Sequence, residues 1–472
     1  MEQRQQHFLL LTYPAQGHIN PALQLAKRLA RTTGSRVTFS TAISGHRRMF
    51  PSLAKPDEEV DDGILSFIPY SDGYDDGFKA TTDDVTTYMS RIKLVGSRTV
   101  STLVQDLAAR DRPVSCIIYT LILPWAMDVA RDRGVPSALY WIQPATVFSI
   151  YYHYFHGYDE LIISHSHDPV FAVNLPRLPP LQIRDLPSFF STTNPEHPYY
   201  SIFGRFRELF EMLDREEKSS KPRILMNTFD ALETDAIKAI DNMELVAIGP
   251  LVTFLPLDGK DSNGIISEGN LFKPDNKGYM EWLDCQPERS VVYVSFGSLS
   301  LMTKQQLEQM LWGLKESGRP FLWVVRKDNR GEGVEPEDGE NGMVVEWCSQ
   351  VKVLSHPSVG CFVTHCGWNS TLESLVYGVP TVGVPQWTDQ ATNARLAEAW
   401  GTGVRGEVNE EGVLEGKELK RCLEVVMGEG ERGMEIRRKT EMWRDRAREA
   451  VREGGSSDGN LRTFVEDIAS NK

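Results

Sequence analysis

Short apolar runs alternate with amphipathic stretches along most of this chain. The runs HFLLLTYP (7–14) and RVTFSTA (36–42) have the length and composition of buried strands. Between them, Ala22, Leu25 and Leu29 recur at the spacing of one helix face. Because later stretches continue this order, the first part of the chain is predicted to form a parallel sheet covered on both faces by helices.

The same plan starts again near Ser290. Its strand-like runs are SVVYVSFGS, RPFLWVVR, GMVVEW, GCFVTH and TVGVP. Residues 249–270, between the two series, are rich in Gly, Pro, Ser and Asp without a sustained period, which is typical of a linker. We therefore predict an α/β protein with an N-terminal domain over 1–248 and a second domain over 271–454. The terminal segment 455–472 is predicted to return to the N-terminal domain through an amphipathic helix, NLRTFVEDIASNK, which follows the breaker GGSSDG.

Composition agrees with two soluble domains. The chain has 472 residues, 41% of them apolar and 25% charged, which is too long for one core and ordinary for a globular protein. The net charge of −14 argues against nucleic acid or an anionic membrane as a partner. The cysteines form no CxxC pair, and the longest apolar stretch, near Pro124, is about half a membrane span. We expect a cytoplasmic protein without an integral membrane segment, and nothing in the pattern requires more than a monomer.

His18 lies directly after the first predicted strand, in LTYPAQGHINP (11–21). Asn20 and Pro21 predict that the next helix begins there, with an N-cap and a first-turn proline, which leaves His18 in the preceding turn. Most histidines in such turns are structural. The carboxyl end of a strand is nevertheless where open α/β sheets bind ligands, which favours a functional role.

Two other motifs do not fit their context. A GxGxxG is formed by Gly401, Gly403 and Gly406. It follows a predicted helix, whereas a dinucleotide site requires a strand before it. A cluster of possible zinc ligands is formed by His356, Cys361, His365 and Cys366. Its spacing matches no zinc module, and strand alternation separates Cys366 from the others, so these cysteines are predicted to be structural.

The stretch from Trp347 to Gln390 carries the strongest chemical signal. A strand, GCFVTHCG, leads directly into a helix, WNSTLESLVYG, whose N-terminus offers free amides to an anion. His365, Asn369 and Ser370 cluster there, as phosphate donors would. Ser370 and Glu373 also have the spacing of a capping box. Capping alone would not explain the neighbouring histidine and asparagine.

This 44-residue stretch resembles the signature box of plant secondary-product UDP-glycosyltransferases over its full length. The similarity extends from PAQGHINP to the terminal helix, and the subgroup it resembles contains anthocyanin and flavonoid glucosyltransferases and glucose-ester-forming enzymes. The resemblance implies the GT-B fold, in which two Rossmann-like domains face each other across a cleft. It also implies inverting transfer of glucose from UDP-glucose, with no cofactor and no metal.

The resemblance assigns the donor residues. Trp347 would stack on uracil, Gln350 would help to hold the nucleoside, and Glu373 would bind the ribose hydroxyls. The pyrophosphate would be held by Ser298, His365, Asn369 and Ser370. The sugar would be met by Trp368, Asp389 and Gln390. A closing Gln in this box goes with glucose donors in the family, whereas His there is associated with galactose.

His18 is the general base by the same resemblance, and here the sequence departs from the family. The position that usually holds an Asp partner for this histidine is Thr120, which carries no charge. Asp128, on the next predicted helix, is not expected to substitute for it. Without a carboxylate the histidine is a weaker base. A carboxylic acid acceptor, with a pKa of about 4, needs no base, whereas a phenol near 10 does.

The acceptor pocket is expected in the first domain, in the aromatic stretch that contains Trp141, Gln143 and Phe148. The predicted function is glucosylation of a small plant phenolic, foremost a flavonoid or anthocyanin, with formation of a β-O-glucoside. Glucose-ester formation on a carboxylic acid is the alternative within this class. The alternatives from other classes are a non-catalytic UDP-sugar or aglycone binding protein and, on the misplaced glycine motif, a nicotinamide oxidoreductase.

Overall fold

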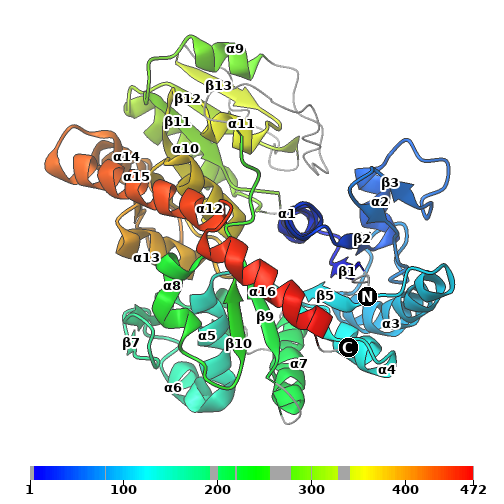
Figure 1. The fold of residues 1–472 in the computed structure, drawn as a ribbon. Helices are drawn as coiled ribbons and strands as arrows, with labels where there is room; N and C mark the ends of the chain where they lie inside the picture. The colour runs from blue at the N-terminus through cyan, green and yellow to red at the C-terminus, as the bar shows by residue number, and fades with distance from the viewer. Residues whose placement is uncertain are drawn as a thin grey trace. The chain divides into compact units, whose positions relative to one another are not determined.

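The computed structural model describes residues 5–79, 81–191, 200–217, 221–255, 278–298, 300–327 and 341–470. These residues divide into two compact units (Figure 1). Unit 1 contains the described residues up to Val252 and from Glu449 onward, and unit 2 those from Thr253 to Arg448. The predicted domain limits stay predictions, and residues 256–270 of the predicted linker lie outside the described ranges.

Unit 1 is built on an eight-stranded sheet with the order β10-β9-β6-β5-β1-β2-β4-β3. The central strand β1 is buried along its whole length and pairs in parallel with β2 and β5. Only β3 runs antiparallel to its neighbour. The strands are β1 His7–Thr12, β2 Arg36–Thr41, β3 Val60–Asp61, β4 Ser66–Phe67, β5 Cys116–Thr120, β6 Ser137–Trp141, β9 Arg223–Met226 and β10 Glu244–Ala247.

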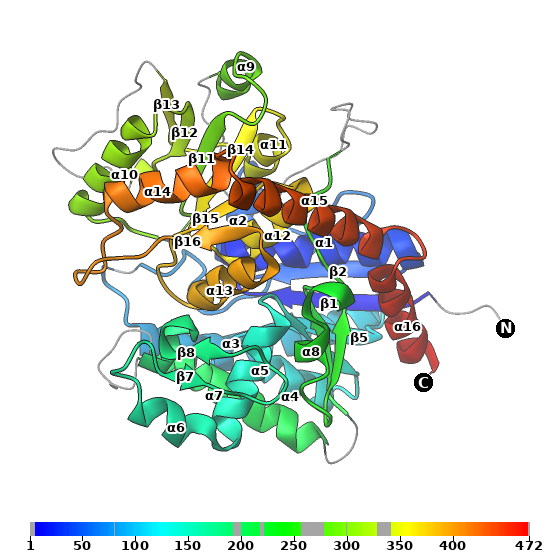
Figure 2. The ribbon, with the colours of Figure 1, turned by 90° about the vertical axis from the view of Figure 1, so that its left-hand side faces the viewer.

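Helices cover both faces of this sheet. Figure 2 shows α1 on one face of β1 and β2, and α3 and α4 on the other. The helices of unit 1 are α1 Gln16–Thr33, α2 Ile43–Met49, α3 Val85–Ala109, α4 Trp125–Asp132, α5 Ala145–His153, α6 Asp159–Ser164, α7 Tyr200–Glu217, α8 Asp230–Ile237 and α16 Ser456–Ser470. A small hairpin pairs β7, Ala172–Val173, with β8, Leu181–Gln182. The sheet with helices on both faces is the arrangement that the alternating pattern predicted.

Helix α1 begins earlier than its sequence predicted. Gln16 is its first residue and Ala15 its N-cap, so His18 lies in the first turn of the helix and Pro21 lies inside it. The backbone N–H groups of His18 and Ile19 both donate to the carbonyl oxygen of Ala15, at 2.9 Å. A proline near the start of a helix forgoes only one early backbone bond. The N-cap assigned to Asn20 is therefore wrong, because the helix has already formed a turn before it.

The terminal helix α16 packs on α1 and β10 within unit 1. The ring of Phe464 lies 6.0 Å from that of Phe8 on β1. Ser457 Oγ donates to the carbonyl of Gly249 at 2.6 Å, and Arg462 Nη1 to that of Thr32 at 2.9 Å. The predicted breaker GGSSDG partly belongs to this helix, since Ser457 is buried and bonded in its first turn.

Unit 2 is built on a fully parallel sheet with the order β13-β12-β11-β14-β15-β16. Its strands are β11 Val291–Ser295, β12 Phe321–Val324, β13 Gly342–Val345, β14 Val359–Thr364, β15 Thr381–Gly383 and β16 Gly403–Arg405. Its helices are α9 Tyr279–Asp284, α10 Lys304–Glu316, α11 Gln350–Leu354, α12 Trp368–Tyr377, α13 Gln390–Trp400 and α14 Gly416–Met427, and α15 Glu431–Val451 continues into unit 1. The core lies between the sheet and α10 and α14, which pack against each other.

The three glycines of the GxGxxG serve the backbone of unit 2. Gly401 ends α13 with a left-handed φ of 72°. A Cβ at Gly403 would lie 2.2 Å from Thr381 Oγ1 on the neighbouring strand, and one at Gly406 would lie 2.6 Å from the side chain of Leu414. The motif is therefore explained by helix termination and close strand packing, which agrees with its rejection as a dinucleotide site.

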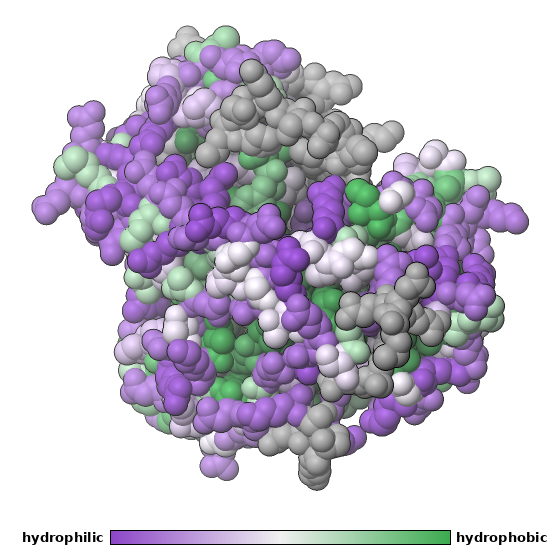
Figure 3. Space-filling view, in the orientation of Figure 1, coloured by the Kyte–Doolittle hydropathy of each residue, from purple (hydrophilic) through white to green (hydrophobic). Residues whose placement is uncertain are grey.

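The surface is mainly polar. Most of the face drawn in Figure 3 is hydrophilic, as expected for a chain with 25% charged residues. None of the helices within the described ranges combines the length and the apolar composition needed to cross a bilayer.

Candidate active site

The N-terminus of α12 in unit 2 is not capped by a side chain. Its N-cap is Gly367, which has no side chain that could bond to the first-turn amides. Ser370 and Glu373, whose spacing suggested a capping box, lie inside the helix and accept hydrogen bonds from Gln350 Nε2 at 3.0 and 2.6 Å. The capping alternative is therefore wrong. A helix N-terminus has a positive dipole end, which favours an anion.

His365 lies between two glycines just before this helix. A Cβ at Gly297 would stand 2.8 Å from His365 Nε2, and one at Gly367 would stand 2.6 Å from it, so only glycine leaves room for the ring on each side. Gly297 also has a left-handed φ of 70°. Burial lowers the pKa of His365 to about 4, with a smaller contribution from the nearby charge of Arg326. His365 is therefore neutral at pH 7 and can offer a hydrogen bond but no charge.

The loop after β11 is held by an arginine that the sequence analysis missed. Arg326 is buried, and its guanidinium donates to the carbonyl oxygens of Gly297 at 2.6 Å and Ser300 at 3.0 Å. These bonds fix the loop that contains Ser298, a predicted pyrophosphate ligand. The available signal was a charged residue at the end of the apolar run RPFLWVVR.

Gln350 makes hydrogen bonds to several residues around the predicted nucleoside site. Besides its bonds to Ser370 and Glu373, its Oε1 accepts from the hydroxyl of Tyr293 at 3.3 Å. Tyr293 is buried on β11 and stacks on Phe362 of β14, so the strand order places this hydroxyl. Three of the predicted donor residues are thus brought together. Trp347 is half-buried just beyond β13, in the same segment as Gln350.

Asp389 is held by a second residue that the sequence analysis missed, and Gln390 by backbone groups of its own loop. Asn393 Nδ2 donates to Asp389 Oδ2 at 2.7 Å and to the carbonyl of Cys366 at 2.8 Å. Gln390 Oε1 accepts from the backbone N–H groups of Gln386 and Trp387, at 2.8 and 3.0 Å. Gln390 therefore shapes its own loop in addition to any sugar contact. The signal for Asn393 was its i+4 spacing from Asp389 on a buried helix face.

Two other predicted donor residues have distinct surroundings. Trp368 is 3% exposed, and its ring lies 6.2 Å from that of Trp400, so the ring belongs to the core. The predicted contact of Trp368 with the sugar stays a prediction. Asn369 follows it in the first turn of α12 and is half-buried.

His18 stands at the carboxyl end of β1 in unit 1, beside Thr120 of β5. His18 Nδ1 and Thr120 Oγ1 are 3.4 Å apart, and the backbone N–H of Tyr13 also donates to this hydroxyl at 3.4 Å. Burial lowers the pKa of His18 to about 3, and no charged group offsets the effect. Asp128 forms an ion pair with Arg131 on the exposed side of α4. As expected, Asp128 does not replace the missing carboxylate.

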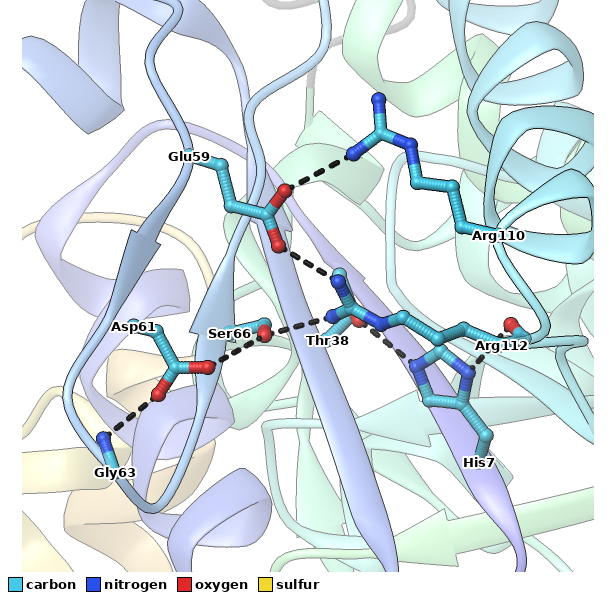
Figure 4. A network of polar contacts seen from close by, with 8 residues as sticks. All are labelled: His7, Thr38, Glu59, Asp61, Gly63, Ser66, Arg110 and Arg112. Carbon is cyan, nitrogen blue, oxygen red and sulfur yellow. Dashed lines mark hydrogen bonds and ion pairs between the residues drawn. The ribbon is translucent and has the colours of Figure 1, made fainter.

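Two other histidines show what a structural histidine looks like in this protein. His7 bonds through both ring nitrogens, to the carbonyl of Arg112 at 2.9 Å and to Thr38 Oγ1 at 2.8 Å (Figure 4). His356 also uses both nitrogens, with Ser358 and Asp284. Within the described part of the chain, His18 Nε2 has no hydrogen-bond partner. A free ring nitrogen at a strand end is what a base requires.

The predicted acceptor residues are placed differently from expectation. Trp141 and Phe148 are completely buried and contact each other edge to face at 5.1 Å. The Trp141 indole N–H donates to the carbonyl of Pro144 at 2.9 Å. Neither ring presents a surface to an acceptor, because the aromatic stretch forms the core. Gln143 is half-buried, and its Oε1 has no hydrogen-bond partner among the described residues.

The possible zinc ligands do not converge. Cys361 is completely buried in the core of unit 2, and His356 bonds to Asp284. Across the described ranges, no group of three or more His, Cys, Asp or Glu side chains has an arrangement that could hold a metal ion. All six cysteines are free, and burial raises the pKa of Cys366 to about 12. Cys361 and Cys366 are buried in unit 2, which agrees with a structural role for both.

Comparison with known proteins places the chain in a family. Residues 264–451 match the family model described as "UDP-glucoronosyl and UDP-glucosyl transferase". A solved rice protein, Os79 from O. sativa in complex with UDP, superposes with a TM-score of 0.81 at 34% identity, covering 98% of this chain and 100% of that one. The chain belongs to this family of glycosyltransferases and has the GT-B fold with two Rossmann-like domains.

The curated relatives are plant glucosyltransferases. The chain is 50% identical to phloretin 4'-O-glucosyltransferase of Malus domestica and 50% identical to the chloroplastic crocetin glucosyltransferase of Gardenia jasminoides. Each alignment covers 98% of both proteins. The protein is a UDP-glucose-dependent glycosyltransferase. The oxidoreductase alternative is wrong, and the family gives no support to a non-catalytic binding protein.

Proposed function

We propose that this enzyme transfers glucose, with inversion, from UDP-glucose to a hydroxyl of a small plant phenolic, foremost a flavonoid or anthocyanin. The product is a β-O-glucoside. The observation that carries the proposal is His18, a neutral histidine at the end of β1 whose Nε2 is unbonded within the described ranges. The relative named for phloretin, a compound with phenolic hydroxyls, supports this acceptor class.

The donor roles follow from the geometry of unit 2. The amides at the N-terminus of α12 and the neutral His365 would donate hydrogen bonds to the diphosphate as UDP departs. Ser298, Asn369 and Ser370 would add to this set. Trp347, Gln350 and Glu373 would hold the nucleoside, and Trp368, Asp389 and Gln390 the sugar. This arrangement stabilises the leaving group without a metal.

Thr120 fixes the tautomer of the base. If the Nδ1–H of His18 donates to Thr120 Oγ1, the Nε2 lone pair is left to accept the proton of the acceptor hydroxyl. The hydroxyl of Thr120 can orient the ring, but it cannot stabilise the imidazolium as a carboxylate does. The proton transfer is therefore supported by orientation alone on this side of the ring.

Glucose-ester formation is the second candidate, and the same observation favours it. A carboxylate acceptor is already ionised at neutral pH, so it does not depend on a strong base. The relative named for crocetin, a dicarboxylic acid, supports this class. Both acceptor classes use the same donor site, so the acceptor alone separates the two candidates.

The test compares His18→Ala with the wild-type enzyme on one phenolic and one carboxylate acceptor, with UDP release as the readout. We expect kcat with the phenol to fall by about 100-fold or more, as loss of a general base does. With the carboxylate we expect little change. Equal collapse on both acceptors would show that carboxylates do not bypass the base. Absence of UDP release by the wild-type enzyme across a broad panel of phenols and acids would refute the proposed acceptor classes.

Three further proposals concern the state of the enzyme. We expect activity to persist in EDTA, since hydrogen-bond donors of the protein would stabilise the departing UDP.

A single monomeric species is expected in light scattering. A cytoplasmic location, proposed from the unpaired cysteines, is to be checked by imaging a fluorescent fusion, because the crocetin relative is described as chloroplastic.

A further inference from the structure

Two neighbouring arginines of α2 have different partners. Arg47 forms an ion pair with Asp76 at 3.0 Å. Arg48 donates only to carbonyl oxygens, from Nε to Ser44 at 3.3 Å and from Nη2 to Pro14. Within the described ranges, Arg48 has no carboxylate partner, and its Nη1 makes no hydrogen bond. One of the two guanidinium charges is therefore left without a compensating anion.

Arg48 is bound to the loop that leads to the proposed base. Pro14 lies between β1 and α1, four residues before His18. A Cβ at Gly45 would lie 3.0 Å from that of Pro14, so α2 packs tightly on this loop. The neighbouring ring of Tyr13 lies 5.3 Å from the ring of His18. The guanidinium and the imidazole are thus fixed to one short segment of unit 1.

Aromatic side chains lie next to this segment. The ring of Tyr88 lies 6.3 Å from Tyr13, 4.9 Å from Tyr74 and 4.8 Å from Phe78. Tyr13, Tyr74 and Phe78 are only half-buried, so they can offer ring surface to a planar molecule. We call Tyr13, Tyr74, Phe78 and Tyr88 the tyrosine cluster.

The carboxylates of the loop 71–78 are bonded to other groups than Arg48: Asp75 accepts from the hydroxyl of Ser71 at 2.7 Å, and Asp76 pairs with Arg47. Asp72 is completely buried and accepts from the backbone N–H of Tyr74 at 2.8 Å and from the hydroxyl of Tyr88 at 3.5 Å. Its burial raises its pKa, which favours the uncharged form. Its two oxygens are thus bonded within the tyrosine cluster and its loop, while the charge of Arg48 remains available.

We propose that Arg48 is a specificity-determining residue that binds the carboxylate of a planar aromatic acid acceptor, whose ring packs on the tyrosine cluster. The inference rests on the proposed function and narrows its acceptor class to acids. A guanidinium binds a carboxylate through its N–H groups, and in Arg48 the Nη1 group makes no hydrogen bond within the described ranges, so it is left to select a carboxylate over a neutral group. The carboxylate held by Arg48 would position the acceptor, while a different oxygen, the phenolic hydroxyl, would react.

The test uses two acceptors, 4-hydroxycinnamic acid and its methyl ester, in which a methyl group replaces the negative charge of the carboxylate. The variant is Arg48→Gln, and the matched control is Arg47→Gln, whose arginine lies on the same helix but is already paired with Asp76. We expect Arg48→Gln to raise KM for the acid by about 10-fold or more, the effect of losing a charged hydrogen bond. KM for the ester and for UDP-glucose should stay unchanged, and Arg47→Gln should affect neither acceptor.

Equal changes with acid and ester in Arg48→Gln, or the same loss in Arg47→Gln, would overturn the inference. If Arg48→Gln fails to fold, the inference is tested with Arg48→Lys and with a salt titration of the wild-type enzyme, with KM for acid and ester as the readout. Lysine should keep part of the preference for the acid, and added salt should raise KM for the acid alone; otherwise the inference fails. The proposed function would fail differently, through absence of UDP release by the wild-type enzyme with either acceptor.

Discussion

His18 and His365 are half-buried histidines that stay neutral at physiological pH. Burial alone lowers the pKa of His18 to about 3, and burial is the largest cause of a pKa of about 4 for His365. The same residue type can then perform opposite tasks. In the proposed mechanism, His365 would donate a hydrogen bond to the diphosphate, and His18 would accept a proton. In both cases partial removal of the ring from water favours the neutral form before any substrate binds.

Installing the missing carboxylate behind His18 should change the pH profile. In the Thr120→Asp variant, the negative charge favours the imidazolium and raises the pKa of His18. A raised pKa means that the neutral base is lost at a higher pH as the solution is acidified. We therefore expect the acid limb of kcat/KM for a phenol to move to higher pH, and kcat to rise on the order of tenfold because the base is stronger.

Thr120→Asn is the control for this measurement. It has the shape of aspartate without its charge, so the acid limb should remain where it is in the wild-type enzyme. Melting temperatures of both variants report the cost of a polar group at a position that is completely buried. Identical pH profiles for the Asp and Asn variants would mean that charge behind His18 does not govern its basicity.

At the scale of elements, the proposed donor site is assembled from loops that follow parallel strands. The loop after β11 holds Gly297 and Ser298, and the turn after β14 holds His365. Both lie at the carboxyl edge of the sheet because the strands are parallel neighbours. The site therefore depends on the register of two strands and on the space left between their loops.

Gly297→Ala should weaken UDP binding because the added methyl group would fill the space beside the His365 ring. The new Cβ would meet His365 Nε2 at 2.8 Å, so the ring or the loop must move. We expect UDP affinity to fall about 10-fold or more by calorimetry, which corresponds to the loss of a charge-assisted hydrogen bond. Gly318→Ala is the matched control. It has a similar φ of 66° in the same unit, but nothing lies within 4 Å of the added atom.

Gly318→Ala should therefore cost only backbone strain, about 1–2 kcal/mol in the free energy of unfolding. Its UDP affinity should equal that of the wild-type enzyme. Unchanged UDP affinity in Gly297→Ala would mean that the histidine and the glycine are not coupled in binding.

The sequence predicted long elements well and short ones poorly. Buried strands such as β1 and β14 are unbroken apolar runs, so their pattern is unambiguous. Strands of two or three residues, such as β4 and β16, are too short to show a period. The start of α1 was misplaced because a proline was assigned to the first turn, whereas the carbonyl of Ala15 had already begun the helix.

The site was predictable where one local segment supplies it. The long box between Trp347 and Gln390 was found because its residues follow one another in sequence. Arg326 and Asn393 were missed because their roles depend on carbonyl and carboxylate partners that only the fold brings close. The acceptor residues were misassigned for a related reason, since an aromatic run such as that around Trp141 fills a core as readily as it lines a pocket.

At the scale of the whole chain, unit 1 includes α16, although all of unit 2 separates this helix in sequence from the sheet of unit 1. The hydrogen bond between Arg462 and Thr32 joins residues separated by 430 positions. Leu461 and Phe464 of α16 are buried, the latter near Phe8 of the central strand. The stability of unit 1 therefore depends on a segment that is connected to it through unit 2.

Phe464→Ala should destabilise unit 1 selectively. Removing a buried phenylalanine costs about 3–5 kcal/mol. We expect a lower midpoint for the unfolding transition of unit 1, followed by the fluorescence of its own tryptophans such as Trp141. UDP affinity should be unchanged because the donor residues lie in unit 2. Thr463→Ala, on the exposed side of the same helix, should leave the transition in place. Equal melting of both variants would mean that α16 adds little to unit 1.

The packing of α16 also has a consequence for how the protein is made. During synthesis, β1 and α1 leave the ribosome long before α16, the segment that covers them. Domains generally fold in the order of their translation. Unit 1 must wait, with the side of α1 and the end of β10 uncovered, until unit 2 has been translated. A stalled or truncated message would release a chain with that apolar surface open to aggregation and to chaperones. Unit 1 is therefore fully packed only in chains that have been translated through α16.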